Sequence, residues 1–390
     1  MATKGSKIWK TILLWALLIL AIILLSRMRL SVPLYDYVNY WSAGRLNLQG
    51  NNPYDLDQLL FQQQQVGWTE EWVLPTWYPP WALSILMPFS LFSYTPSRFL
   101  WFLASVSILV FAIVQSWKIY EGPPRQMWLG LFIGVLFTPT LIALMLGQAS
   151  PWILLGVMGF LVYIKKSRSL WLAGIFAGLI SIKPQLLSLF WIALVLWSLK
   201  QRKWQVLAGS GVSIVIGLAI ASIFNPAVLI EYIQSILSSP PFFLATPTIG
   251  FFLRTFLGYE KSFLQFVPTL LGVVWLIFYW GKKHSTWDWQ QEMPILIFVS
   301  IITAPYTWSH DQLILTPALM QATILLLHFR NHLKTMFLLA IFLCVNITNL
   351  LIHKLLDETW VIWMAPVLLV CYLIARQSKQ ESHPLQEGSS

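Results

Sequence analysis

The chain has 390 residues, of which 57% are hydrophobic and only 10% are charged, against about 25% charged residues in an ordinary soluble domain. This composition excludes a soluble globular protein and indicates an all-α polytopic membrane protein. The net charge of +10 does not predict a nucleic-acid partner, because the basic residues fall in short clusters between apolar segments.

Apolar segments recur along the chain and predict its membrane spans. The first, residues 8–26, follows three lysines and lacks a small-residue cleavage site, so we expect it to remain as an anchor. The run 81–92 is too short to cross a bilayer and is expected to be a re-entrant or interfacial helix. The other expected spans are 97–117, 126–145, 150–164, 169–182, 184–199, 204–224, 266–281, 293–304, 311–328, 335–352 and 360–375.

Basic clusters assign the two sides, since Lys and Arg near span ends are retained in the cytoplasm. The clusters are Lys4/Lys7/Lys10, Lys118 with Arg125, Lys165/Lys166/Arg168, Lys200/Arg202/Lys203, Lys282/Lys283, Arg330 with Lys334, and Arg376 with Lys379. Each consecutive pair encloses an outward and a return span, which predicts about 12 transmembrane helices with both termini cytoplasmic. Residues 1–376 then form one membrane module, with external loops at about 26–96 and 225–265, and 377–390 form a disordered cytoplasmic tail.

In this topology the unusual polar residues gather at the external ends of spans or in external loops. They are Asp36, Tyr78-Pro79-Pro80, Gly147-Gln148, Lys183-Pro184-Gln185, Arg254 and His310-Asp311. A transporter tends to place its charges near the bilayer midplane and to contain internal repeats. The sequence contains no internal repeat, which weakens the transporter interpretation. The gathering of polar groups at one face favours a reaction at the membrane surface.

The first external loop carries three acids. Asp36 is a candidate general base, because a carboxylate that is partly desolvated at the membrane boundary has a raised pKa. The alternative is that it caps a helix from Tyr37 to Leu46. Asp55 and Asp57 have the spacing of a metal-binding pair, but the preceding Pro53-Tyr54 is more typical of a turn that leads into a helix.

The cationic candidates each have two interpretations. Lys183 is either a functional buried charge or a lysine that extends to a lipid phosphate. Arg254 either clamps a phosphate in a bidentate manner or faces lipid headgroups. His310 either contacts an anionic oxygen and relays a proton, or pairs locally with Asp311. Gln148 follows a glycine expected at a helix C-terminus, where its side chain either faces a cavity or belongs to a plain cap.

These motifs, in this order, resemble glycosyltransferase family 87, whose members are polyprenyl-phosphate-mannose-dependent α-mannosyltransferases of the GT-C superfamily. The resemblance extends from Asp36 to His310. It rests on Asp36, Tyr40, Ala43, Leu46, Gly50 with Pro53-Tyr54, Tyr78 with Pro79-Pro80, Gly147-Gln148, Lys183-Pro184-Gln185, and Pro305 with Trp308 and His310.

The resemblance implies a GT-C fold and a metal-independent enzyme of the plasma membrane, with no cofactor and its active site on the external face. It implies that Asp36 is the catalytic base and that Lys183 and His310 lie near the phosphate of a polyprenyl-phosphate sugar donor. Arg254 matches no motif of the family, and it is a phosphate-binding candidate only because it is positively charged and lies on the predicted external side. The expected substrate-lining residues are Tyr37, Tyr40, Tyr78, Gln148, Gln185, Trp308 and Asp311.

The implied reaction is the transfer of a hexose, most simply mannose, to a lipid or glycan acceptor. The acceptor hydroxyl loses its proton to Asp36 as it attacks the anomeric carbon. The lipid phosphate departs without a general acid, and a single displacement inverts the anomeric centre. The alternatives are a transporter or flippase of lipid-linked sugars and a non-catalytic subunit of a cell-envelope assembly.

Overall fold

A computed structural model describes residues 35–166, 169–241, 244–327 and 332–381. Throughout these ranges the regular structure is helical and includes no strand. The predicted anchor at 8–26 lies outside the described residues. The predicted tail at 377–390 begins within the last helix, which ends at Glu381.

The loop predicted to be the first external one contains short helices, as expected: α2 (Tyr37–Leu48), α3 (Leu56–Gln64) and α4 (Pro80–Ser90). The last of these corresponds to the short apolar run at 81–92. It packs against α2 and α11, and its Leu83 and Met87 side chains are buried. The loop predicted to be the second external one contains α12 (Val228–Ser238), α13 (Ile249–Leu257) and the short helix η4 (Ser262–Gln265).

Every other predicted span within the described ranges coincides with a helix or with two consecutive helices. These are α5 (Tyr94–Ile119), η1 (Pro124–Gln126), α6 (Met127–Leu136), α7 (Thr138–Leu146), α8 (Ser150–Lys166), α9 (Leu170–Ile180), η2 (Pro184–Leu187), α10 (Ser188–Gln201), α11 (Trp204–Phe224), α14 (Val267–Lys283), α15 (Trp289–Thr303), η5 (Ser309–Leu315), α16 (Thr316–Leu327), α17 (His332–Leu355), η6 (Glu358–Trp363) and α18 (Met364–Glu381). In the described part, four helices are long and apolar enough to cross a membrane, or five if α6 and α7 together form one bent span. The chain is therefore a helical membrane protein, while the number of 12 spans stays a prediction.

The expected span 126–145 is bent by 59° between α6 and α7. Phe137 is extended at this break, and Pro139 lies in the first turn of α7. The interruption leaves backbone groups without helical partners, which is tolerated in a membrane only if other groups bind them. Asn346 of α17 fills this need, because its Oδ1 accepts from the Thr138 N–H at 2.6 Å and its backbone carbonyl accepts from the Thr138 hydroxyl at 3.0 Å.

Small residues allow α9 and α11 to lie close together. A Cβ added to Gly174 would lie 2.2 Å from the carbonyl oxygen of Val206, and one added to Gly209 would lie 2.5 Å from that of Trp171. The Ser210 hydroxyl also donates to the Gly174 carbonyl at 3.1 Å. Packing of this kind joins helices in lipid, where the hydrophobic effect does not drive them together.

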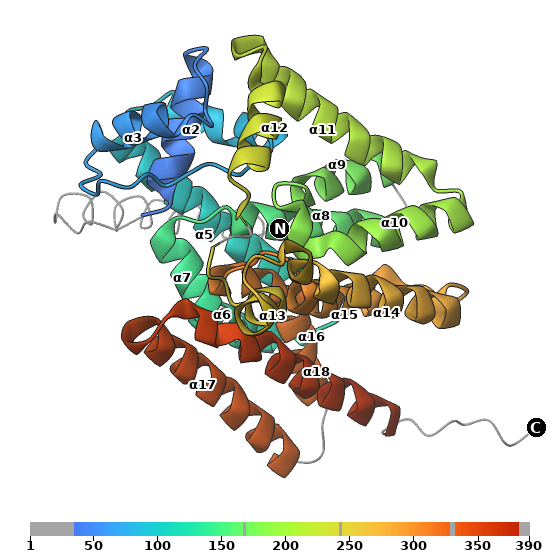
Figure 1. Ribbon diagram of the computed structural model, residues 1–390. Coiled ribbons are helices and arrows are strands. Elements are labelled where there is room, and N and C mark those ends of the chain that lie inside the picture. Colours follow the sequence, from blue (N-terminus) through green and yellow to red (C-terminus); the bar gives the residue numbers. More distant parts are fainter. Residues whose placement is uncertain (1–34, 167–168, 242–243, 328–331, 382–390) are drawn as a thin grey trace, which may run out of the picture.

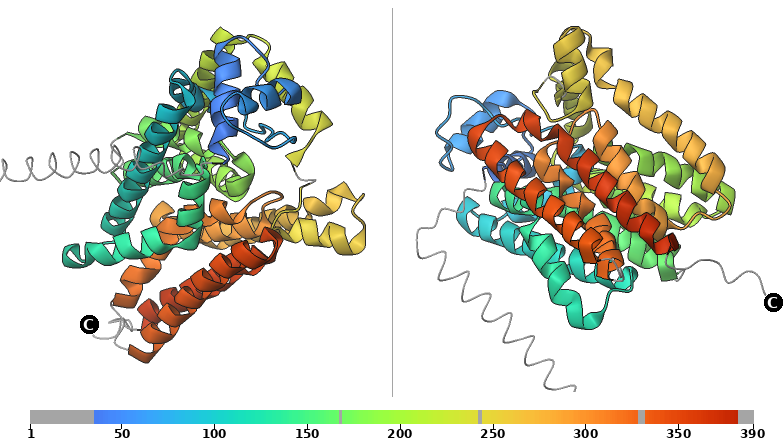
Figure 2. Two further views of the ribbon diagram at one scale, coloured as in Figure 1. Left: turned by 90° about the vertical axis from the view of Figure 1, so that its left-hand side faces the viewer. Right: turned by 90° about the horizontal axis from the view of Figure 1, so that it is seen from below.

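The helices of the first loop and α12 lie at one end of the molecule, and α17 and α18 run side by side at the opposite end (Figures 1 and 2). Between these ends, several helices start or stop near one another. These junctions are the turn before α2, the link from α7 to α8, the link from α9 to η2, and the starts of η5 and η6. They carry the polar residues of the candidate site.

Candidate active site

A cavity of about 790 Å³ lies where these helix junctions meet. Most of the residues that sequence analysis assigned to the site contribute to its wall. The predicted site residues that line the cavity are Asp36, Tyr40, Tyr78, Gln148, Lys183, Gln185, Trp308 and His310. Residues that lie up to 274 positions apart in the sequence, from Asp36 to His310, therefore share one space.

Asp36 stands immediately before α2 but does not cap it. Its side chain makes no capping hydrogen bond, and its Oδ2 instead accepts from the Gln148 amide. The capping alternative for this carboxylate is therefore wrong. Burial raises the pKa of Asp36 to about 6, against the opposing effects of the Gln148 hydrogen bond and the Lys183 charge. A carboxylate with this pKa is ionised at neutral pH and is a stronger base than an exposed aspartate.

Gln148 connects the acid to the cation. Gly147 ends α7 in the left-handed conformation, with φ of 72°, so that the chain turns and directs the next side chain into the cavity. The amide nitrogen of Gln148 donates to Asp36. Its Oε1 accepts from the Tyr40 hydroxyl at 2.7 Å and from the Lys183 ammonium at 3.3 Å. The interpretation of this motif as a plain cap is therefore wrong, because the glycine ends the helix while the glutamine faces the cavity.

Lys183 forms a buried ion pair with Asp311. Its Nζ lies 2.7 Å from Asp311 Oδ1, and the two side chains are 8% and 0% exposed. The same oxygen accepts from the Ser150 hydroxyl at 2.8 Å, and Asp311 Oδ2 accepts from the backbone N–H of Trp308 at 3.1 Å. Burial opposes the charge of Lys183, but the Asp311 carboxylate more than offsets it and holds the pKa of the lysine above its usual range. The alternative of a lysine extended to lipid is therefore wrong.

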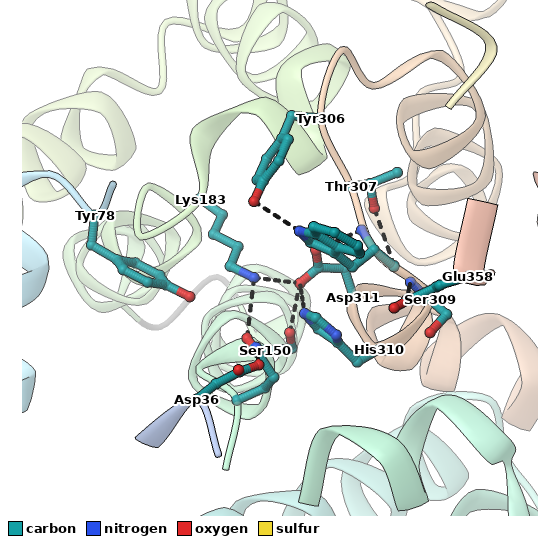
Figure 3. Close-up of polar contacts among 12 residues, drawn as sticks. Asp36, Tyr78, Ser150, Lys183, Tyr306, Thr307, Ser309, His310, Asp311 and Glu358 are labelled. Atoms are coloured by element: carbon teal, nitrogen blue, oxygen red, sulfur yellow. Dashed lines mark hydrogen bonds and ion pairs between the residues drawn. The ribbon is translucent and has the colours of Figure 1, made fainter. Parts of the chain in front are cut away.

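His310 has two ring nitrogens without a hydrogen-bond partner in the described part of the chain. The residue is 4% exposed and lines the cavity. Its Nε2 lies 3.7 Å from Asp311 Oδ1 (Figure 3), so the local pairing with Asp311 is present as a close contact that is too long for a hydrogen bond. Burial lowers the pKa of His310 to about 3, so the imidazole is neutral at neutral pH and can donate one N–H to a ligand.

Aromatic side chains complete the wall around the ion pair. The hydroxyls of Tyr40 and Tyr78 lie 2.6 Å apart, and the Trp308 indole donates to the Tyr306 hydroxyl at 2.7 Å. Lys183 Nζ lies 5.7 Å from the centre of the Tyr78 ring. Rings held in this way offer flat apolar faces beside polar groups, a combination that suits a sugar.

Tyr37 and Arg254 are two of the three predicted site residues that do not line the cavity. Tyr37 packs its ring against Trp101, at a centroid distance of 5.2 Å, and its hydroxyl bonds to Ser97, so it is not part of the cavity lining described above. Arg254 is fully buried and donates to the Tyr259 carbonyl at 3.0 and 2.8 Å. It neither faces lipid headgroups nor lines the cavity. Tyr37 was expected to line the substrate site and Arg254 to bind phosphate. Neither lines the cavity, because position in the chain and charge do not fix the direction of a side chain.

Asp55 caps α3, since its Oδ1 accepts from the Gln58 N–H at 2.9 Å. This confirms the interpretation of Pro53-Tyr54-Asp55 as a turn into a helix. Asp311, which was expected to line the substrate, instead lies behind the wall as the partner of Lys183.

Several residues of the cavity wall were not predicted as site residues. They are chiefly Asn39, Trp72, Trp77, Tyr232, Tyr306 and Glu358. Tyr306 lies in the same polar and aromatic run as His310, so its position in that run was an available signal. Glu358 stands at the start of the last predicted span, and nothing in its sequence context distinguishes it from the adjacent Asp357.

The fold and the cavity together define a helical membrane protein with a buried polar site at its helix junctions. The sequence model of glycosyltransferase family 87 matches residues 76–352, and the chain belongs to this family. It is therefore a membrane glycosyltransferase. No curated protein and no solved structure gives a match to the chain.

Proposed function

We propose that the protein transfers a hexose, most simply mannose, from a polyprenyl-phosphate donor to a lipid or glycan acceptor, with Asp36 as the general base. The single observation that carries this proposal is the Asp36 carboxylate, which lines the cavity with a pKa of about 6 and is held by Gln148. Membership of a glycosyltransferase family favours this function over a transporter or flippase.

The chemical step needs a base on the acceptor side. An alcohol is a weak nucleophile, and removal of its proton by Asp36 strengthens its attack on the anomeric carbon. The new C–O bond forms as the bond to the phosphate oxygen breaks, and the proton remains on Asp36. One displacement inverts the anomeric centre, through a transition state with oxocarbenium character.

The leaving phosphate needs positive or hydrogen-bonding partners as its charge develops. We propose Lys183 and His310 for this role. Lys183 supplies the positive charge, and the unpaired ring nitrogens of His310 supply a neutral N–H donor. Because these groups serve the phosphate and the phosphate leaves readily, we expect the reaction to need no metal or other cofactor. Arg254 is not included, since its guanidinium is bound to Tyr259.

We further propose a GT-C fold with 12 spans, both termini in the cytoplasm of a plasma-membrane protein, and a cavity that opens to the external face. The donor's apolar tail would then lie among the spans while its phosphate reaches the cavity. The support is the placement of the basic clusters in the sequence.

Transfer by the purified full-length protein tests the proposal. The assay supplies radiolabelled polyprenyl-phosphate β-mannose and octyl α-mannoside, with a membrane glycolipid extract as a second acceptor. We expect Asp36→Asn to lower kcat by about a hundredfold or more. The product should be sensitive to α-mannosidase. In the wild type, kcat/KM should fall as the pH is lowered through about 6, because Asp36 must be ionised to accept the proton.

Asp55→Asn is the matched control. It removes an acid from the same loop, and asparagine can still cap α3, so its rate should stay within about twofold of the wild type. Wild-type rates in the Asp36→Asn protein would exclude Asp36 as the base. A β-linked product would exclude the inverting mechanism.

A further inference from the structure

Glu358 lies in the cavity but outside the segment that the family model matches. It is the first residue of η6, six positions beyond the end of the match at residue 352. Its side chain lines the same cavity as Asp36 and His310. Within the described part of the chain it has no cationic partner, whereas Asp311 is paired with Lys183.

The Glu358 carboxylate holds the backbone next to His310. Its Oε1 accepts from the Ser309 N–H at 2.7 Å (Figure 3). The Ser309 hydroxyl is bonded in turn to His353 Nε2 at 2.7 Å. Two side chains of the C-terminal hairpin therefore fix the residue before His310. The imidazole of His310 has no hydrogen bond of its own in the described part of the chain, so its direction depends on this backbone.

The charge of Glu358 also acts on Asp36. Three charged groups influence the proton of Asp36: Lys183 favours the carboxylate form, while Glu358 and Asp311 disfavour it. The negative charge of Asp311 is largely cancelled by its contact with Lys183. Burial raises the pKa of Glu358, as do the nearby acids Asp311 and Asp357, whereas the hydrogen bond from Ser309 opposes this and favours the ionised carboxylate. Glu358 is therefore the acid of the cavity wall whose charge is least compensated.

We infer that Glu358 is a positioning residue of the transfer site, which holds the Ser309–His310 turn and supplies an uncompensated negative charge to the cavity that Asp36 lines. This inference rests on the proposed function, because it acts through the proposed base and the proposed phosphate donor. The two effects are separable, since one needs only a hydrogen-bond acceptor at position 358 and the other needs a charge.

Two substitutions separate them in the mannosyl-transfer assay described above. Glu358→Gln keeps an oxygen that can accept from Ser309 but removes the charge. We expect its KM for the donor to stay within a few-fold of the wild type, and the acidic limb of its kcat/KM profile to move to lower pH. The limb moves to lower pH because removal of a nearby negative charge makes the Asp36 carboxylate easier to ionise, which lowers its pKa. Glu358→Ala also removes the acceptor, and its donor KM should rise tenfold or more.

Asp357→Asn is the matched control. It removes a negative charge from the adjacent position, and its side chain can still cap η6. Its acidic limb and donor KM should equal those of the wild type. Thermal unfolding in detergent checks that each variant folds; if Glu358→Ala does not, the pH profile of Glu358→Gln still decides the charge effect.

The outcomes distinguish this inference from the proposed function. If the acidic limb of Glu358→Gln coincides with that of the wild type, or if Glu358→Ala keeps the wild-type donor KM, the role of Glu358 is overturned while the base assignment stands. If Asp36→Asn transfers mannose at the wild-type rate, the proposed function fails, and with it the reason for the inference.

Discussion

The Lys183–Asp311 pair determines how much free charge the cavity can offer. Both groups are buried and lie 2.7 Å apart, so the lysine stays positively charged while Asp311 balances most of its charge. A buried pair of this kind is costly to break, since removal of one partner leaves an uncompensated charge in an apolar surrounding. A donor phosphate would meet Lys183 without displacing Asp311, because an ammonium has three donor hydrogens.

This arrangement predicts how single and double substitutions will differ. Lys183→Met leaves Asp311 buried and unpaired, and we expect the free energy of unfolding to fall by about 3 kcal/mol or more. Adding Asp311→Asn to the same chain should restore most of that loss, because the remaining buried charge is removed. Neither protein should transfer sugar at the wild-type rate, since both lack the cation.

Thermal unfolding in detergent measures stability for this pair of variants, and the transfer assay measures function. Asp288→Asn serves as the control, since Asp288 is an exposed acid that caps α15 through the Gln290 N–H and an asparagine can take over that cap. If the double variant were less stable than Lys183→Met, the ion pair would not explain the burial of these two residues.

At the level of helices, the break between α6 and α7 is stabilised from a distant part of the chain. Asn346 binds both polar groups of Thr138 across 208 positions of sequence. The break also sets the direction of α7, and α7 ends at the glycine that points Gln148 into the cavity. The bend therefore helps to position Gln148 in the candidate site.

Substitution of Asn346 by leucine should destabilise the protein by about 1 to 3 kcal/mol, because it leaves the Thr138 N–H without its acceptor. We expect a lower midpoint of thermal unfolding and a larger fractional loss of transfer than stability alone explains, since Gln148 would be less firmly held. Asn225→Leu is the comparison, because it also removes an amide oxygen that accepts from a backbone N–H, that of Ala227, but at a site away from the bend. An unchanged midpoint in Asn346→Leu would show that the bend does not depend on this contact.

For the whole molecule, sidedness is the prediction that connects the site to its substrates. The basic clusters place Ser239 outside and Ser285, which follows Lys282 and Lys283, inside; both residues are exposed. In a chain without Cys344 and Cys371, a cysteine at position 239 should react with an impermeant thiol reagent added to intact cells. One at position 285 should react only after the cells are opened, and the reverse pattern would place the cavity on the cytoplasmic side.

Most of the helices and much of the candidate site can be predicted from the sequence for a simple physical reason. A membrane span must be apolar, so Asp36, Lys183 and His310 stand out where they border or interrupt apolar segments. The remaining features depend on contacts between distant residues. The partner of Lys183 lies 128 positions away. Pro139 marks the position of the bend near Phe137, but the Asn346 contact that stabilises it comes from 208 positions away. Glu358 is one of several acids near the start of a span.

The location of the site at helix ends also constrains how the length of this chain can vary. Each residue added to a helix advances its end by about 1.5 Å and rotates it by about 100°. One inserted residue in α9 would thus carry Lys183 out of phase with Asp311, even though no wall residue had changed. Insertions in the connections at the other ends of the helices leave that phase intact. We therefore expect natural variation in length to collect in those connections, whereas the helices that lead to the cavity keep their lengths.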